Sequence, residues 1–330
     1  MNHPLDYFVG LSLGKPFLAL CVGALLCSPS TSAFAQEEIR GVGPVGKMFL
    51  VAEGLGFAEG PASDHKGNLY FTDFPNNRVH RLSPSGELTI VVENSGQANG
   101  LMINRSGELF ACQMDGRLVA YSMDKPAKVR IVAAKYNGRA FNAPNDLVID
   151  AAGGVYFTDP PLEKTPLRQD RIAVYYVTVD GHVSRLIDDL EFPNGVMLSP
   201  DEKTLYVVNS KSPQVMAYPV EGIGQIGEAR VFCVLKQKSN ANMTGGDGLT
   251  VDAKGNLYIA SPLGIQVFDS TGTSLGAIAA PKQPYNVTFG GPSGRTLFIA
   301  AESSIYAAKM AVPGHIFQDD PLDRSHKESK

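Results

Sequence analysis

Six short apolar stretches along the chain are each preceded by a Glu, Asn or Asp, at intervals of 40, 46, 49, 53 and 39 residues. A repeat of this length that carries only strand and turn signals is typical of a β-propeller blade. Because the first strand of every blade lines the central channel, the six leading side chains are expected to converge on one axis. These residues are Glu59, Asn99, Asn145, Asn194, Asp247 and Asn286.

Each unit repeats the same order of strand and turn. In the first unit, residues 60–63 are expected to form the inner strand, and residues 68–73, 78–82 and 88–92 the next three. Short β-branched or aromatic runs between turn residues are what an all-β protein requires. The second strands of the other units are expected at residues 108–113, 154–159, 204–209, 256–261 and 296–301. The sequence therefore predicts an all-β, six-bladed β-propeller with four antiparallel strands per blade.

The last unit lacks a fourth strand, and an unused strand precedes the first unit. The sixth repeat ends after its third strand at residues 304–310, whereas the apolar run 48–52 has no place in any repeat. Pairing of this N-terminal strand with the last blade would close the ring and cover an exposed sheet edge. We expect the propeller to span residues 36–312 and residues 313–330 to form a polar, frayed tail.

The first 35 residues have the pattern of a secretory signal peptide. Lys15 precedes an apolar run at residues 17–27, and the small-x-small triplet Ala33-Phe34-Ala35 predicts cleavage before Gln36. Lipid attachment at Cys27 is an alternative reading of the same segment. The run is too short to span a bilayer, and no other stretch is long enough. The sequence thus predicts an exported protein, periplasmic or secreted, without a membrane span once the signal is removed.

Charge and cysteine content narrow the range of partners. The formal net charge is −4 over 330 residues, and no basic patch stands out. Nucleic acid is therefore not an expected partner. Cys112 and Cys233 remain outside the signal and would fall in different blades, so we expect them to be unpaired, buried and apolar in character.

The leading residues favour a site for a hard cation. A ring of carboxylate and amide oxygens suits Ca²⁺, which takes about six to eight oxygen ligands. Mg²⁺ prefers stricter octahedral geometry, and no His or Cys cluster has zinc-ligand spacing. The alternative is that Asn-Gly and Asp-Gly pairs only form turns, an interpretation that covers Asn99, Asn194 and Asp247. It does not cover Glu59 or Asn145, which begin poorer turns.

A second set of polar residues is expected on the same face, farther from the axis. Antiparallel strands return to the face from which the inner strand starts, so the second strands end there. We expect these residues to orient the ring. They are Asp73, Gln113, Asp159, Asn209 and Ser261.

The remaining chemistry points to metal-assisted hydrolysis. The chain has no Gly-x-Ser-x-Gly elbow, no His-Glu-x-x-His pair and no phosphate-binding glycine loop. A bound cation polarises a carbonyl or phosphoryl oxygen. Asp247 could then act as general base on water or as nucleophile, and the sequence does not choose between the two roles.

Five segments make the chain resemble the senescence-marker-protein/gluconolactonase/luciferin-regenerating-enzyme family of six-bladed propellers. The resemblance spans roughly residues 46–310, and the segments are Phe57–Pro61, Ala143–Asp146, Tyr156–Pro161, Phe192–Gly195 and Gly245–Leu249. It implies that Glu59, Asn194 and Asp247 bind a divalent cation, usually calcium, and that Asp247 is the acid/base. It also implies that Asn145 is a further ligand or a substrate contact. Members hydrolyse sugar lactones and other lactones, and relatives hydrolyse organophosphate esters.

Two features depart from the family pattern. Val208-Asn209-Ser210 replaces a triplet that often carries an Asp, and the charged stretch 162–171 would border the pocket. Within this stretch Arg168 or Arg171 could reach an anionic substrate, although solvated loop charges are the simpler interpretation.

These observations predict an exported, Ca²⁺-dependent hydrolase that opens a sugar lactone, with the metal as Lewis acid and Asp247 as general acid/base. Asn145, Asn99 and Asn286 are the expected substrate contacts. One alternative is a phosphotriesterase-like or other ester hydrolase that uses the same ion. The other is a non-catalytic binding module in which the ion only braces the channel.

Overall fold

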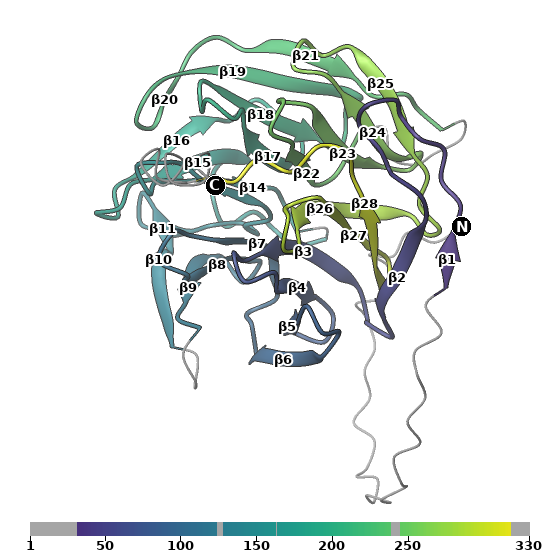
Figure 1. Cartoon of the computed structure of the whole chain (residues 1–330). Coiled ribbons are helices and arrows are strands. Elements are labelled where there is room, and N and C mark those ends of the chain that lie inside the picture. Colours follow the sequence, from purple (N-terminus) through teal and green to yellow (C-terminus); the bar gives the residue numbers. More distant parts are fainter. Residues whose placement is uncertain (1–31, 124–127, 163, 239–244, 318–330) are drawn as a thin grey trace, which may run out of the picture.

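A computed structural model describes residues 32–123, 128–162, 164–238 and 245–317. Over these residues the chain contains strands and no helix, and six antiparallel sheets are arranged in a ring around a common centre (Figure 1). The predicted six-bladed propeller with four strands per blade is confirmed. No helix in this part of the chain is long and apolar enough to cross a membrane.

Each blade contains four consecutive strands in sheet order, counted from the channel outward. Blade 1 has β3 (Ala58–Ser63), β4 (Leu69–Asp73), β5 (Arg78–Leu82) and β6 (Leu88–Glu93). Blade 2 has β7 (Ala98–Ile103), β8 (Leu109–Gln113), β9 (Arg117–Tyr121) and β10 (Val129–Ala133). Blade 3 has β13 (Leu147–Ile149), β14 (Val155–Asp159), β15 (Ala173–Val177) and β16 (Val183–Ile187).

The other three blades follow the same order. Blade 4 has β17 (Pro193–Leu198), β18 (Thr204–Asn209), β19 (Gln214–Gly222) and β21 (Arg230–Val234). Blade 5 has β22 (Leu249–Val251), β23 (Leu257–Ser261), β24 (Gly264–Phe268) and β25 (Ser274–Ile278). Blade 6 has β26 (Pro284–Gly290), β27 (Thr296–Ala301), β28 (Ser304–Lys309) and, as its outer strand, β2 (Met48–Glu53).

The ring is closed by strands from both ends of the chain. β2 pairs antiparallel with β28 from Met48 opposite Ala308 to Glu53 opposite Ser304. This pairing confirms the predicted closure, and Met48 is fully buried within blade 6. A two-residue strand, β1 (Ala33–Phe34), lies outside β2. It falls inside the segment expected to be a signal peptide, most of which (residues 1–31) lies outside the described residues.

Two short additions extend the blades. β11 (Lys135–Tyr136) and β12 (Arg139–Ala140) form a small hairpin in the connection between blades 2 and 3. β19 is nine residues long and pairs with β20 (Gln225–Ile226) beyond its own blade.

The core lies between neighbouring blades. The second strands β4, β8, β14 and β23 are buried along their whole length, and apolar clusters fill each gap from one blade to the next. Cys112 lies in the cluster between blades 2 and 3, and Cys233 in the cluster between blades 4 and 5. Both thiols are free and buried, as predicted.

The end of the propeller differs from the predicted boundary at residue 312. Pro313 accepts a hydrogen bond from the Ala253 amide at 2.9 Å, and the His315 amide donates to the Val251 carbonyl at 3.0 Å. Residues 313–317 therefore follow the inner strand of blade 5, where Phe317 packs against the cores of blades 4 and 5 (yellow segment in Figure 1). These residues are not a frayed tail because their backbone is paired. Residues 318–330 lie outside the described part of the chain.

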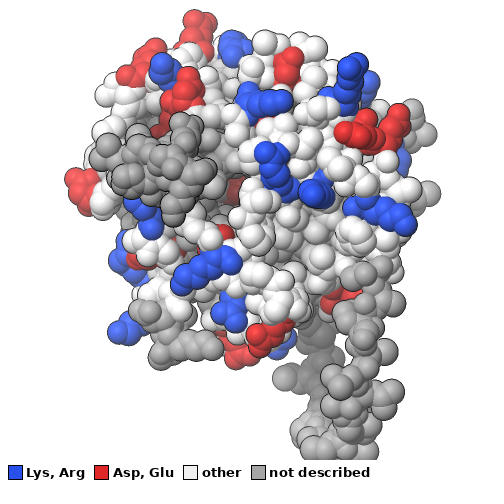
Figure 2. All heavy atoms as spheres, viewed as in Figure 1, with Lys and Arg blue, Asp and Glu red and all other residues white. Residues whose placement is uncertain are grey.

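Charged side chains of both signs are interspersed over the face seen in Figure 1. Lys and Arg side chains alternate with Asp and Glu there, and most of the exposed atoms between them are uncharged (Figure 2). No single sign of charge dominates this face.

Candidate functional site

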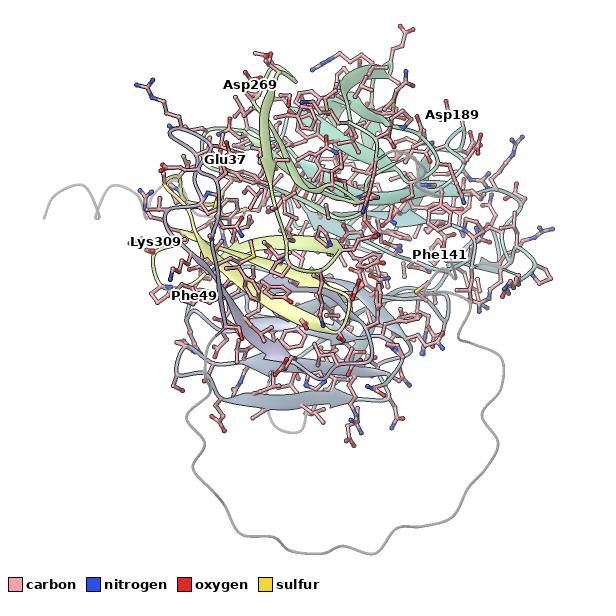
Figure 3. The ribbon with its side chains drawn as sticks, turned by 90° about the vertical axis from the view of Figure 1, so that its right-hand side faces the viewer. Glu37, Phe49, Phe141, Asp189, Asp269 and Lys309 are labelled. Atoms are coloured by element: carbon pink, nitrogen blue, oxygen red, sulfur yellow. The ribbon has the colours of Figure 1, made fainter. Side chains whose placement is uncertain are left out.

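The leading residues lie at one face of the ring. Phe141 and Asp189 precede the inner strands of blades 3 and 4, and Figure 3 shows them on the side opposite Lys309, the last residue of β28. The entry to each inner strand thus shares one face with the connection from the second to the third strand. This is the face that antiparallel connectivity predicts.

None of the leading residues sits in a hairpin turn. Glu59, Asn99, Asn194 and Asn286 lie within β3, β7, β17 and β26. Asn145 and Asp247 stand just before β13 and β22, yet their amides donate to Thr158 and Ala260 of the second strand, both at 2.9 Å. The alternative interpretation of Asn99, Asn194 and Asp247 as turn formers is therefore wrong.

Backbone irregularities accompany these positions. The pairing register shifts between Glu59 and Ala62, between Ala98 and Leu101, between Pro193 and Val196, and between Pro284 and Asn286. A β-bulge bends its strand and changes the direction of the side chain next to it. The bulges therefore set the orientation of the leading side chains at the channel mouth.

Hydrogen bonds connect the leading residues of neighbouring blades. The Gly100 amide donates to the Asn145 carbonyl at 2.7 Å, and the Gly248 amide donates to Tyr285 at 2.8 Å. The Thr158 hydroxyl donates to the Asn194 carbonyl at 2.7 Å. An ideal Cβ placed on Gly100 would lie only 2.6 Å from the Asn145 carbonyl oxygen. Glycine after the leading residue is thus explained by close approach of inner strands.

Two carboxylates are brought together in this ring. Glu59 is 5% exposed and Asp247 is 9% exposed, and each interacts electrostatically with the other. Glu59 accepts hydrogen bonds from the Gly60 amide at 3.0 Å and from the Asn286 side chain. Asp247 accepts a hydrogen bond from the Asn194 side chain. The structure therefore joins Glu59, Asn286, Asn194 and Asp247 at one place.

The pKa values of these carboxyls are shifted upward. Burial raises the pKa of Glu59 to about 7, although its hydrogen bonds oppose the shift. Burial also raises the pKa of Asp247 well above its ordinary range, and the charges of Glu59 and Asp146 raise it further. Shared burial of like charges favours proton uptake or a bound cation.

Asp146 is a site residue that the sequence analysis did not single out. It is 7% exposed, its carboxylate accepts a hydrogen bond from the Leu147 amide at 2.9 Å, and burial raises its pKa to about 7. The charge of Glu59 adds to that shift. Its position beside Asn145 was a signal that only the register of β13 could interpret.

Asn99 and Asn145 lie elsewhere on the ring. The Asn99 amide nitrogen contacts the Met114 sulfur at 3.8 Å. The Asn145 carbonyl binds Gly100 of blade 2. These two residues therefore occupy the blade 2 and blade 3 side of the channel mouth, across from Asn194 and Asp247 in blades 4 and 5.

The outer polar set holds the loops that lead into the inner strands. Asp73 accepts hydrogen bonds from the Gly56 and Phe57 amides at 2.9 and 3.3 Å. Asp159 accepts from Asn142 and Ala143 at 2.9 and 2.8 Å. Asn209 accepts from the Phe192 amide, Gln113 donates to the Ser95 carbonyl, and Ser261 accepts from Gln266. These groups position the entry backbone and have no printed bond to the ring side chains.

Arg168 does not project as a solvated loop charge. Its guanidinium donates to the backbone carbonyls of Asn142 at 2.9 Å and of Phe141 and Met114 at 3.4 Å. The loop that follows β14 is thereby fixed onto the loop that leads into blade 3. The expected approach of this arginine to an anionic substrate is not supported.

The donor set fits a hard cation that uses amide as well as carboxylate oxygens. Within the residues described, no three His, Cys, Asp or Glu side chains are grouped as metal ligands, and no ion pair involves Glu59, Asp146 or Asp247. Two buried carboxylates without a cationic side chain need neutralisation. Glu59 and Asp247, together with the amide of Asn194, can supply oxygen ligands to one ion.

Comparison with known proteins agrees with this geometry. The SMP-30/Gluconolactonase/LRE-like region matches residues 57–303. The chain belongs to this family.

Individual relatives carry lactonase names. The gluconolactonase of Zymomonas mobilis is 36% identical over 187 residues, which span 53% of this chain and 52% of that protein. The match thus spans about half the length of that relative. The pentonolactonase XacC of Haloferax volcanii is 28% identical over 73% of this chain and 80% of its own length. The solved structure of XC5397, a gluconolactonase from Xanthomonas campestris, has a TM-score of 0.72 at 27% identity, covering 80% of this chain and 89% of that one. The fold and the family are those of lactone hydrolases.

Proposed function

We propose that this protein is a Ca²⁺-dependent hydrolase that opens a sugar lactone. The observation that carries the proposal is the pairing of two buried carboxylates, Glu59 and Asp247, with amide side chains at the channel mouth. Lactonase names among relatives that match most of this chain support the same substrate class.

The ion would be held by Glu59, Asn194 and Asp247, with Asn145 as a further oxygen donor. When bound, it supplies Lewis acidity toward the lactone carbonyl oxygen. Carboxylate and amide oxygens without His or Cys are the ligands that Ca²⁺ prefers.

Asp247 has the position required of the general acid/base. It would take a proton from the water molecule whose oxygen attacks the carbonyl carbon, and return that proton to the ring oxygen as the ester bond breaks. Asn194 holds its carboxylate by a hydrogen bond, so the base has a fixed orientation. Asn99, Asn145 and Asn286 are the groups that would contact the substrate.

Export of the protein is part of the proposal. Residues 1–35 would direct secretion and be removed before Gln36. Expression of the full chain in a bacterium, followed by N-terminal sequencing of the protein in the periplasmic fraction, tests this point. A mature chain that still begins at Met1 would contradict it.

The decisive assay is hydrolysis of D-glucono-1,5-lactone by purified protein, before and after removal of bound metal with a chelator. The proposal predicts loss of activity and recovery on addition of Ca²⁺. Full activity in the metal-free protein would overturn the mechanism. Turnover of organophosphate esters without lactone turnover would favour the phosphotriesterase-like alternative, and no turnover with the ion bound would favour a binding module.

A further inference from the structure

One small apolar cluster stands apart from the cores between blades. It consists of Phe74, Met114 and Ala143, with Leu162 packed against them. Phe74 and Met114 each follow the second strand of their blade, and Ala143 precedes Asn145. All of them therefore lie at the face that carries the leading residues. We call this cluster the apolar wall.

The apolar wall borders the ring directly. The Met114 sulfur contacts the Asn99 side chain at 3.8 Å, and Ala143 is two residues from Asn145. Phe74 and Met114 are 8% and 7% exposed, which is as much as Asn99 and Asn145. The wall and the leading residues thus share the same narrow opening to solvent.

The location of the proposed ligands places the substrate beneath this wall. Glu59, Asn194 and Asp247 belong to blades 1, 4 and 5, so an ion that they share leaves the blade 2 and blade 3 side of the mouth for the substrate. That side is lined by Asn99 and Asn145, with the apolar wall next to them.

Polar groups next to the wall are already engaged. The Asn142 carbonyl oxygen of its side chain accepts from the Arg168 and Gln169 amides, both at 2.9 Å, and its NH₂ donates to Arg171. Both oxygens of Asp159 accept backbone amides, and Arg168 donates to backbone carbonyls. None of these three side chains is arranged to bind a substrate hydroxyl.

We propose that the apolar wall accepts the end of the sugar lactone farthest from its carbonyl, and that this end is a methyl group rather than a hydroxymethyl group. The inference rests on the proposed function and names its substrate class as 6-deoxy sugar lactones. A terminal hydroxyl buried against Met114 and Phe74 would lose its hydrogen bonds to water without gaining a partner. A methyl group has no such loss and adds apolar contact.

A matched pair of substrates tests the proposal. We expect kcat/KM for a 6-deoxyhexono-1,5-lactone to exceed that for the parent hexonolactone of the same stereochemistry by about 5- to 150-fold. Met114→Gln introduces an amide of similar size, and should bring this ratio close to one. The same substitution at Met216, half-buried on β19 away from the mouth, should leave the ratio unchanged.

The outcomes separate the inference from the function on which it rests. A wild-type ratio at or below one, with both lactones hydrolysed, overturns the inference and leaves the proposed function intact. An unchanged ratio in Met114→Gln shows that the wall does not set the preference. If neither lactone is hydrolysed, the proposed function fails and the inference fails with it. The wild-type ratio decides the matter even if the Met114 variant does not fold.

Discussion

At the scale of single residues, the chemistry of the site depends on Asp247. Replacement of Asp247 by Asn retains an oxygen ligand of the same size and removes the group that accepts a proton. We expect kcat to fall by about 10²- to 10⁴-fold. Asp115→Asn, on an exposed carboxylate at the same face that pairs with Arg117, is the matched control and should keep its activity. An Asp247→Asn enzyme with wild-type kcat would reduce this residue to a structural role.

The raised pKa values make a second prediction at this scale. Burial raises the pKa of Glu59 from its ordinary value to about 7. Between these two values the unfolded chain releases a proton that the folded chain keeps, so stability falls as the pH rises through this window. The melting temperature of chelated protein is therefore expected to decrease from about pH 5 to about pH 8. Added Ca²⁺ should reverse much of the decrease at the higher pH, because it binds the ionised carboxylates.

Glu59→Gln provides the comparison for this titration. The variant has no carboxyl at this position, so its melting temperature should decline less over the same pH range. Equal pH dependence of wild type and Glu59→Gln would contradict the assignment.

At the scale of strands, the glycines next to the leading residues are explained by the close approach of neighbouring blades. An Ala side chain at Gly100 would meet the Asn145 carbonyl and the Asp146 side chain at 2.6 Å. We expect Gly100→Ala to destabilise the fold by about 2 kcal/mol. Gly222→Ala is the control, because the nearest atom to its added Cβ is 3.6 Å away on a flexible side chain. Denaturant unfolding of both variants measures the difference, and equal stability would contradict close packing at Gly100.

The sequence was sufficient to predict the strands and their order. Turn residues at a regular spacing identified β4, β8, β14, β18, β23 and β27 before any coordinates were considered. The segments without regular spacing were not predicted: β11, β12 and the β19–β20 extension lie in connections whose length differs between blades.

The candidate site was predicted less completely than the fold. The spacing located Glu59 and Asp247, because each stands at the start of a repeat. It did not locate Asp146, since a carboxylate one residue farther along reaches the centre only through the bend of the chain before β13. It also did not anticipate Arg168, whose backbone partners depend on how two loops pack.

At the scale of the whole molecule, the fold depends on joining its two ends. Met48 is fully buried where β2 completes blade 6. Met48→Ala leaves a cavity at this closure and is expected to cost about 2–5 kcal/mol. The measurement is denaturant unfolding, with Met123→Ala, a partly buried position at the edge of the cluster between blades 1 and 2, as a control of smaller effect. A loss no larger than that of the control would mean that closure contributes little stability.

Closure of the ring also defines the central claim, which is that six blades bring Glu59, Asn194 and Asp247 onto one Ca²⁺ ion. The most direct test is an anomalous difference map from crystals grown with Ca²⁺. The account predicts a single strong peak about 2.3–2.6 Å from oxygen atoms of these three side chains. A map without a peak at the channel mouth, or with a peak that Glu59 and Asp247 do not share, would contradict it.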